Sequence, residues 1–235
     1  MALHRTFEIS NLGGRPFKFR PTSSDNTISM TEPEYGEREL IEAMIGELLP
    51  FDIFLDVGAH TGSWTIPIAL RLNGGGHVYA LEPNPGTFEF LLDNIEVNGI
   101  PNVRSFCCAA SDSDEDRKFF NRGSTELSSF YPDTIDPNAP AVPFSMMKAR
   151  SIDSLIYEGI VQNPTLMKVD VEGAEIDVLL GAQFATRTVR IIIVEIHESV
   201  LQAHGSSTSN VKSLLERMGF AVSETDGGLH LLGRR

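Results

Sequence analysis

Short apolar runs alternate with helical patterns along most of this 235-residue chain, and this alternation restricts the fold more than any other feature of the sequence. The runs that we predict as strands are residues 53–57, 78–81, 103–107, 165–169 and 189–196. The segments with the apolar spacing of helices are residues 64–72, 85–98, 174–180 and 208–218. Strands that are apolar on both faces and alternate with helices favour an α/β fold, in which helices cover both faces of a mostly parallel sheet.

The two ends of the chain differ from this pattern. Residues 1–50 are predicted to form an N-terminal extension, and residues 51–235 the main domain. The hairpin strands and the helix expected in the extension are residues 7–9, 16–20 and 33–49. A stretch near 112–150 is rich in Asp, Pro and Ser, and we interpret it as an irregular insertion. Two last strands around Asp226-Gly-Gly predict a hairpin that adds an antiparallel strand to a seven-stranded sheet.

Composition and charge exclude several functional classes. The chain has 19 Lys and Arg against 32 Asp and Glu, a net charge of −13, which repels phosphate backbones and anionic lipids. Nucleic-acid and membrane partners are therefore not expected, and no apolar run approaches the length of a membrane span. The only cysteines, Cys107 and Cys108, are adjacent and are predicted to be buried in a reducing compartment. The first residues lack a signal-peptide pattern, so we expect a cytoplasmic protein.

The segment Asp56-Val-Gly-Ala-His-Thr-Gly lies where a predicted strand meets its helix. In open α/β sheets, ligands bind at such junctions, beyond the carboxyl ends of the strands. Gly58 allows the backbone to turn close to a ligand, and Gly62 allows the helix to pack against the strand. The acid at Asp56 disfavours a pyrophosphate and suits a cation, such as the ammonium group of a methionine moiety. We predict cofactor contacts from Asp56, Gly58, Ala59, His60 and Gly62.

Two further acids end the next two predicted strands. Glu82 is placed to accept hydrogen bonds from ribose hydroxyls, and Pro83 turns the chain after it. Asp112 is placed to accept from an adenine amine, although it opens an acidic run, and a solvated turn is an equal alternative. The order Asp56, Glu82, Asp112 at successive strand ends matches the methionine, ribose and adenine parts of S-adenosylmethionine. This order predicts the fold of a class I methyltransferase.

Polar residues also end the fourth and fifth predicted strands. Asp170 terminates the fourth, and Glu195 and His197 leave the fifth on one face, because side chains alternate along a strand. A carboxylate and an imidazole at the end of an apolar strand are typical of a functional site, with a satisfied structural pair as the alternative. Lys168 and Glu172 are candidates for substrate binding. A strand-edge salt bridge and a helix-entry acid are their alternative interpretations.

These segments together resemble the FkbM family of methyltransferases. The matching segments are Asp56-Val-Gly-Ala-His-Thr-Gly, Glu82-Pro83, Ser151-Ile-Asp-Ser-Leu, Lys168-Val-Asp-Val-Glu-Gly-Ala-Glu and Glu195-Ile-His. The resemblance covers about residues 52–223, and the family commonly has Asn where this chain has His60. It implies a Rossmann-like class I fold and S-adenosylmethionine-dependent O-methylation, often of sugar or natural-product hydroxyls and sometimes of carboxylates.

Two mechanisms are open for activating an acceptor hydroxyl. His197 is the predicted general base, because histidine titrates nearest neutral pH, and Asp170 or Glu195 would orient it or take the proton. Alternatively, Asp170, Glu195 and His197 would hold a divalent ion such as Mg²⁺, Mn²⁺ or Fe²⁺. A carboxylate acceptor would need neither device. The remaining histidines, including His230, are predicted to lie on the surface.

Other functions explain the sequence less well. A nicotinamide-dependent oxidoreductase would carry Gly-x-Gly-x-x-Gly, which this chain lacks, and would not favour Asp56. A non-catalytic module that binds the cofactor alone is a second alternative, and the acids at Asp170 and Glu195 weigh against it. The expected partner is a small-molecule acceptor, and a homodimer is allowed by the sequence.

Overall fold

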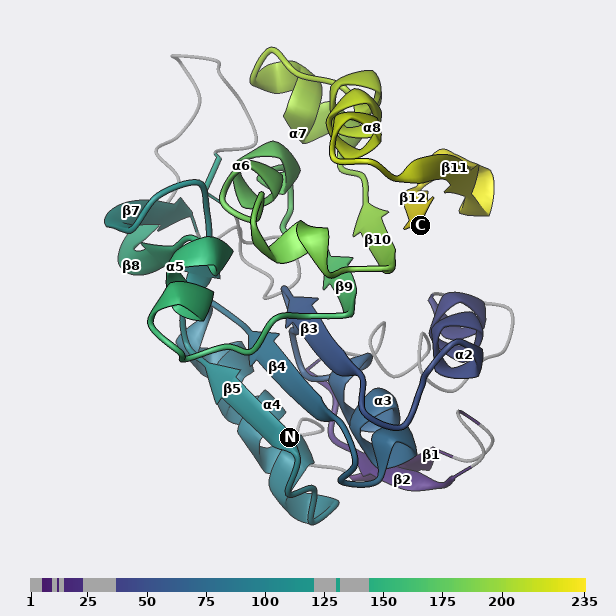
Figure 1. The fold of residues 1–235 in the computed structure, drawn as a ribbon. Helices are drawn as coiled ribbons and strands as arrows, with labels where there is room; N and C mark the ends of the chain where they lie inside the picture. The colour runs from purple at the N-terminus through teal and green to yellow at the C-terminus, as the bar shows by residue number, and fades with distance from the viewer. Residues whose placement is uncertain (1–5, 10–11, 13–14, 23–36, 121–129, 132–143) are drawn as a thin grey trace. The chain divides into compact units, whose positions relative to one another are not determined.

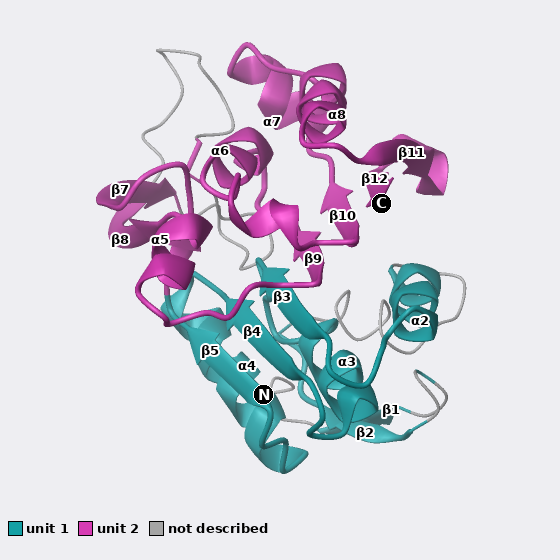
Figure 2. Cartoon of the chain, in the orientation of Figure 1, with its two compact units in different colours: residues 1–107 teal, residues 108–235 magenta. Residues whose placement is uncertain are grey.

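The structure is a computed structural model that describes residues 6–9, 12, 15–22, 37–120, 130–131 and 144–235. The chain divides into two compact units, residues 1–107 (unit 1) and residues 108–235 (unit 2), which are coloured separately in Figure 2. The boundary predicted between residues 50 and 51 lies inside unit 1. Within the described ranges, none of the helices combines the length and the hydrophobicity needed to cross a membrane.

Unit 1 contains three parallel strands and the two helices that connect them (Figure 1). The strands are β3 (Ile53–Val57), β4 (His77–Leu81) and β5 (Val103–Phe106), with β4 in the middle. The helices are α3 (Thr65–Leu72) and α4 (Pro85–Val97). These bounds confirm the predicted alternation and differ from the expected ends by one residue at most.

Large apolar side chains hold these elements together. Phe54 of β3 stacks on Trp64 at 6.4 Å between ring centroids, and both are fully buried. Leu91 of α4 packs against Ala59 and Ala80. Because Ala59 follows β3 and Ala80 lies in β4, this contact fixes α4 against the carboxyl ends of two strands.

The N-terminal part of unit 1 forms the predicted hairpin and helix. Strands β1 (Phe7–Ile9) and β2 (Phe17–Phe19) pair antiparallel, and Phe17 and Phe19 are buried. Helix α2 (Arg38–Gly46) begins later than the helix expected from residue 33, and residues 33–36 lie outside the described part of the chain.

Four strands of unit 2, together with β3, β4 and β5, make up the seven strands predicted for the main sheet. The four strands of unit 2 are β9 (Leu166–Val169), β10 (Ile191–Glu195), β11 (Ala221–Thr225) and β12 (His230–Arg234). Strands β9 and β10 are parallel, whereas β12 is antiparallel to both β10 and β11. This confirms the C-terminal hairpin.

Four α-helices and two short 3-10 turns accompany these strands (Figure 1). The helices are α5 (Ile152–Tyr157), α6 (Glu175–Leu180), α7 (Glu198–Ala203) and α8 (Thr208–Arg217), and the turns are η2 (Ala185–Arg187) and η3 (Asp226–Gly228). The predictions at 174–180 and 208–218 are confirmed as α6 and α8. Helices α5 and α7 have only six residues each and were not predicted.

The stretch predicted as an irregular insertion contains strands, which corrects that expectation. Strands β6 (Ala109–Ala110), β7 (Glu115–Phe120) and β8 (Phe144–Arg150) form a separate sheet, with β8 in the middle. Most side chains of β7 and β8 are exposed or half-buried, so neither strand shows an apolar run. Residues 121–129 and 132–143 of this stretch lie outside the described ranges.

The two cysteines do not share one environment. Strand β5 ends at Phe106, so neither Cys107 nor Cys108 lies within it. Both are free thiols, Cys108 buried and Cys107 exposed, so the prediction that both are buried is wrong for Cys107.

Candidate functional site

Residues 58–62, which we call the glycine loop, connect β3 to the turn before α3. The amides of Gly58 and Ala59 both donate to the carbonyl of Leu81, each at 2.9 Å, so the end of β4 holds the start of the loop. His60 has a φ of 49°, in the left-handed region that Asn, Asp and His adopt more readily than other non-glycine residues. The Asn that is common at this position in the resembling family therefore has a backbone explanation, which His60 also satisfies.

Gly62 closes the loop in a conformation that requires glycine. Its φ is 96°, and a Cβ there would lie 2.9 Å from Cδ1 of Leu91 on α4. The Gly62 amide donates to the Ala59 carbonyl at 2.8 Å. The loop is thus a tight turn held close to α4. The sequence predicts that Gly62 serves the packing of the following helix, and the same Cβ would also lie 3.2 Å from Cγ1 of Ile66 on α3.

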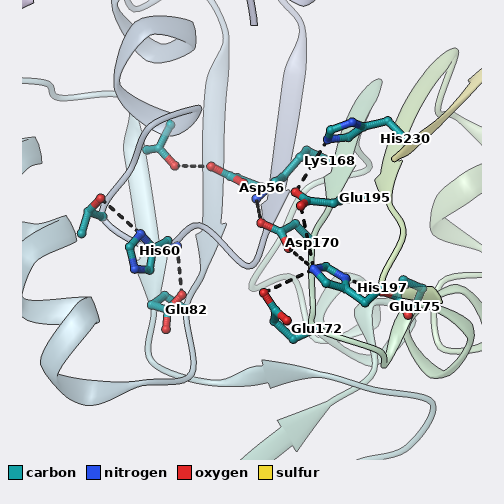
Figure 3. A network of polar contacts seen from close by, with 12 residues as sticks. Asp56, His60, Glu82, Lys168, Asp170, Glu172, Glu175, Glu195, His197 and His230 are labelled. Carbon is teal, nitrogen blue, oxygen red and sulfur yellow. Dashed lines mark hydrogen bonds and ion pairs between the residues drawn. The ribbon is translucent and has the colours of Figure 1, made fainter. Parts of the chain in front are cut away.

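Glu82 follows β4 and faces the glycine loop (Figure 3). Its Oε2 accepts from the His60 amide at 2.9 Å, and its Oε1 accepts from the Asn84 amide at 2.8 Å. The carboxylate therefore ties the glycine loop to the turn that precedes α4. Asn84 in turn caps α4 through the Gly86 amide, and the half-buried Pro83 lies between the two acceptors. The predicted cofactor contacts of Glu82 and Pro83 stay predictions.

Asp56 is fully buried within unit 1. Its Oδ2 accepts from the hydroxyl of Thr65, the first residue of α3, at 2.6 Å. This hydrogen bond ties the end of β3 to the start of α3 on either side of the glycine loop. The contact predicted between Asp56 and an ammonium group stays a prediction.

Asp112 belongs to unit 2 and is exposed. Its Oδ1 accepts from the hydroxyls of Ser111 and Ser113, at 3.2 and 3.1 Å, and lies 3.9 Å from the Arg117 guanidinium. These contacts match the solvated acidic turn that the sequence also allows, and the adenine contact stays a prediction.

The second set of candidate residues gathers around His197, which follows β10 (Figure 3). We name it the His197 cluster, and it consists of Lys168, Asp170, Glu172, Glu175, Glu195 and His197. Nδ1 of His197 lies 2.7 Å from Oε1 of Glu175, and Nε2 lies 3.3 Å from Oε1 of Glu172. Nε2 is also 3.8 Å from the nearest oxygens of Asp170 and of Glu195. The predicted approach of Glu195, Asp170 and His197 is therefore observed.

The contacts of His197 determine its protonation. A neutral imidazole has one N–H, and an ionised carboxylate only accepts, so carboxylates at both ring nitrogens favour the imidazolium. Burial lowers the pKa of His197. Hydrogen bonds to Glu172 and Glu175 and the charges of Asp170 and Glu172 outweigh this effect and raise the pKa to about 11. In this arrangement the ring holds both protons. It can orient the carboxylates and balance their charge, but it has no nitrogen free to accept another proton.

The local backbone explains how two acids of one motif reach the same histidine. Glu172 has a φ of 51° and Gly173 a φ of 98°, so the chain makes a left-handed turn between them. A Cβ at Gly173 would lie 2.3 Å from Cγ1 of Val200 on α7, so only glycine fits. The Gly173 amide donates to Oε1 of Glu175 at 3.1 Å. The Glu-Gly-x-Glu spacing thus places both carboxylates against His197.

Glu175 and His230 are buried against residues of the His197 cluster, which the sequence does not indicate. Glu175 reads as a helix-entry acid, yet its side chain is fully buried beside His197. Its place in the same motif as Glu172 was the available signal. His230 was predicted on the surface, which is wrong: it is 3% exposed, with Nε2 3.6 Å from Glu195 and Nδ1 3.5 Å from Asp226. Nothing in the spacing of His230 indicates that contact.

Lys168 of β9 is buried and forms an ion pair, with Nζ 3.0 Å from Oδ2 of Asp170. This is the structural alternative that the sequence allows, and a substrate contact by Lys168 stays a prediction. The His197 cluster therefore contains four carboxylates and two cations, Lys168 and protonated His197. Its excess of negative charge is available to neutralise a cation or to accept a proton.

The cluster also contains a donor set that fits a divalent ion. Asp170, Glu172 and His197 each offer one ligand atom, and these atoms lie within 4.8 Å of one another. Binding an ion would require Nε2 to lose its proton while Glu175 holds Nδ1, which is the arrangement typical of metal-binding histidines. The sequence predicts Glu195 in this set, whereas the geometry groups Glu172 with the other two. Metal dependence stays a prediction.

Comparisons with known proteins assign the chain to a family. A family model described as "Methyltransferase FkbM domain" matches residues 56–222. Hexuronic acid methyltransferase AglP of Haloferax volcanii is 32% identical over 170 residues, which are 70% of this chain and 64% of AglP. Methyltransferase 1 of Beauveria bassiana is 27% identical over 218 residues, which are 84% of this chain and 85% of that protein. The chain thus spans less than two thirds of the length of AglP.

A solved structure shows the fold. Precorrin-6y C5,15-methyltransferase from Geobacter metallireducens superposes with a TM-score of 0.50 at 13% identity, over 87% of this chain and 92% of that one. This likeness confirms the predicted class I, Rossmann-like α/β fold. Together with the family model, which covers most of the sequence, it leads to one conclusion: the chain belongs to the FkbM family of methyltransferases.

Proposed function

We propose that this protein transfers a methyl group from S-adenosylmethionine to a hydroxyl oxygen of a small acceptor, such as a neutral or amine-bearing sugar. Membership of the FkbM family supports methyl transfer. The observation that supports a hydroxyl acceptor is the His197 cluster, in which four carboxylates that differ in solvent exposure surround one imidazolium.

The cofactor-binding part of the proposal rests on unit 1. S-adenosylmethionine supplies an electrophilic methyl group on a sulfonium. Glu82 would accept hydrogen bonds from the ribose hydroxyls, because it is a carboxylate at the end of β4 that already accepts from amides of the glycine loop and of the turn before α4. The glycine loop would approach the cofactor through backbone alone, since Gly62 has no room for a side chain. The residues present therefore fit this cofactor.

A hydroxyl acceptor must lose its proton as the new bond forms, and a carboxylate of the His197 cluster is the best candidate to take it. Protonated His197 has no free nitrogen, and Glu175 is fully buried. Glu195 has the most exposed side chain of the four acids, at 31%, compared with 23% for Asp170. We therefore assign proton acceptance to Glu195 and its orientation to His197, which exchanges the roles expected from the sequence.

The charge of the cluster also selects among acceptors. Four carboxylates against Lys168 and His197 leave a net charge of about −2, which repels a second anion. A neutral hydroxyl or an amino sugar is therefore favoured over the carboxylate of a uronic acid. The name of AglP indicates a hexuronic acid acceptor for that protein, which keeps methyl esterification as the second candidate.

Turnover against matched sugars tests this proposal. Purified protein would be incubated with S-adenosylmethionine and the methyl glycosides of glucose, glucosamine or glucuronic acid, and release of S-adenosylhomocysteine would be measured. We expect turnover with glucose or glucosamine to exceed that with glucuronic acid. Turnover with glucuronic acid alone would favour the ester. Binding of the cofactor without turnover of any of these glycosides would favour a non-catalytic module that only binds the cofactor.

A chelator separates the two routes of activation. If Glu195 takes the proton directly, turnover is unchanged after treatment with EDTA. Loss of turnover that Mg²⁺ or Mn²⁺ restores would instead assign Asp170, Glu172 and His197 to a metal. Glu195→Gln is expected to lower kcat by about 10²-fold or more, while the exposed Glu216→Gln in the same unit serves as its control.

A further inference from the structure

Two asparagines four positions apart, Asn94 in α4 and Asn98 at its C-cap, hold the N-terminal hairpin. Asn98 accepts from the Lys18 amide at 2.8 Å and donates to the Lys18 carbonyl at 2.7 Å. Asn94 accepts from the Arg20 amide at 2.7 Å and donates to the Arg20 carbonyl at 3.0 Å. Four helical residues rise about 6 Å and two strand residues about 6.6 Å, so the two spacings match. The side-chain amides thus bond to the backbone of β2 at Lys18 and to Arg20, the residue that follows this strand.

The two asparagines differ in one further hydrogen bond. Nδ2 of Asn98 donates to the carbonyl of Asn94 at 2.7 Å, in the last turn of α4. Nδ2 of Asn94 donates to the carbonyl of Thr61 at 2.9 Å, in the glycine loop. Asn94 and Thr61 are both fully buried. Asn94 therefore connects β2 to the glycine loop in a way that Asn98 does not.

Thr61 occupies a sensitive place in that loop. The preceding residue, His60, donates its amide to Glu82, and the following residue, Gly62, is packed against Leu91. The Thr61 carbonyl belongs to the peptide that links Thr61 to Gly62, so its hydrogen bond to Asn94 restrains the orientation of that peptide. A change at Asn94 would reach both the Glu82 contact and the Gly62 turn.

We propose that Asn94 is a positioning residue for the glycine loop, and that through it the β1–β2 hairpin contributes to cofactor affinity. This rests on the proposed binding of S-adenosylmethionine by the same loop. The hairpin is then part of the cofactor-binding apparatus rather than an independent extension, although none of its residues need touch the cofactor.

The asparagines provide their own matched control. Asn94→Asp and Asn98→Asp each keep an oxygen for the hairpin amide and lose both side-chain N–H donors. Titration calorimetry with S-adenosylhomocysteine is expected to show about 3- to 10-fold weaker binding for Asn94→Asp, the effect of one or two lost hydrogen bonds. Asn98→Asp should remain within about 2-fold of the wild type. In turnover, Asn94→Asp should raise KM for the cofactor and leave kcat unchanged.

The outcomes separate this inference from the proposed function. If the wild type binds S-adenosylhomocysteine and the two variants bind equally well, the positioning role is wrong. If the wild type itself does not bind, the proposed function fails first. Hydrogen exchange without cofactor gives an independent measurement, because the bonded amides of Gly58, Ala59, His60 and Gly62 should exchange faster in Asn94→Asp alone.

A second pair of variants, with substitutions in the hairpin, tests the same coupling if Asn94→Asp does not fold. Arg20→Pro removes the amide that bonds to Asn94, and Lys18→Pro removes the one that bonds to Asn98. We expect weaker cofactor binding for Arg20→Pro than for Lys18→Pro. Equal affinities in this pair would overturn the coupling between hairpin and loop.

Discussion

The carboxylates of unit 1 and those of the His197 cluster are held by different kinds of partner. Glu82 accepts from the amides of His60 and Asn84, and Asp56 accepts from the Thr65 hydroxyl. The acids of unit 2 instead surround an imidazolium. Neutral donors fix the shape of a loop without moving protons, whereas a charged network can take up or release them. This difference supports the proposal that unit 1 binds the cofactor and that the His197 cluster takes part in the chemistry.

The largest effect that tests this division is expected for His197→Ala. Loss of the imidazolium removes the group that orients Glu195 and Glu172, so kcat should fall by about 10²-fold or more. Affinity for S-adenosylhomocysteine should not change. His204→Ala, at an exposed position of unit 2, is the control, and His197→Gln retains a donor for Glu175 if the alanine variant is unstable. Full turnover in both His197 variants would remove this residue from the mechanism.

The complementary variant in unit 1 is Glu82→Gln. It keeps the size of the side chain but removes its charge, and cofactor binding should weaken by about 2–3 kcal/mol, or roughly 30- to 150-fold. At saturating cofactor, kcat should be close to that of the wild type. Calorimetry and steady-state kinetics check both statements, with Glu89→Gln on the exposed side of α4 as the control. Unchanged affinity would show that the ribose assignment is wrong.

The charged network should also make stability depend on pH. The pKa of His197 rises from 6.5 to about 11 in the folded protein, so its stabilising effect is complete below about pH 6.5 and is lost as pH rises through 11. Between pH 7 and 11, the free energy of unfolding of the wild type should fall by at least about 1 kcal/mol more than that of His197→Gln. Urea unfolding at a series of pH values measures this, and parallel curves for the two proteins would contradict a folded-state imidazolium.

The smallest effect concerns the shape of the glycine loop. Gly62→Ala introduces a Cβ 2.9 Å from Leu91 at a φ of 96°, whereas Gly99→Ala introduces one at a φ of 60° with nothing within 4 Å. We expect Gly62→Ala to destabilise the protein by about 1 kcal/mol more than Gly99→Ala, because only the first must displace a neighbour. Thermal unfolding compares the two. Equal losses would mean that backbone conformation alone, and not packing against α4, restricts Gly62.

The sequence predicts the parts of this structure that depend on local pattern. Apolar runs with clear breaks predict β3, β4 and β10 to within two residues at each end. Strands β7 and β8 were missed because most of their side chains are not buried, so their sequence lacks both an apolar run and a buried alternation. Backbone pairing between β7 and β8 holds these strands together, and this pairing leaves no pattern in the sequence of either strand.

The site shows the same limit. Position at a strand end was enough to select Glu82, Asp170 and His197, because parallel strands end along one edge. It was not enough to find Glu175 or His230, whose importance comes from burial against His197 and Glu195 after folding. The protonation of His197 also depends on how many carboxylates reach it, and spacing along the chain does not give that number.

The most direct test of the account follows the transferred methyl group itself. Protein would be incubated with S-adenosylmethionine labelled in the methyl group and an equimolar mixture of the methyl glycosides of glucose and glucuronic acid, and the products would then be treated with mild base. The account predicts label that stays on the sugar through base treatment, as an ether does, and that is lost in Glu195→Gln. Label that base releases as methanol, or label that Glu195→Gln transfers at the wild-type rate, would contradict it.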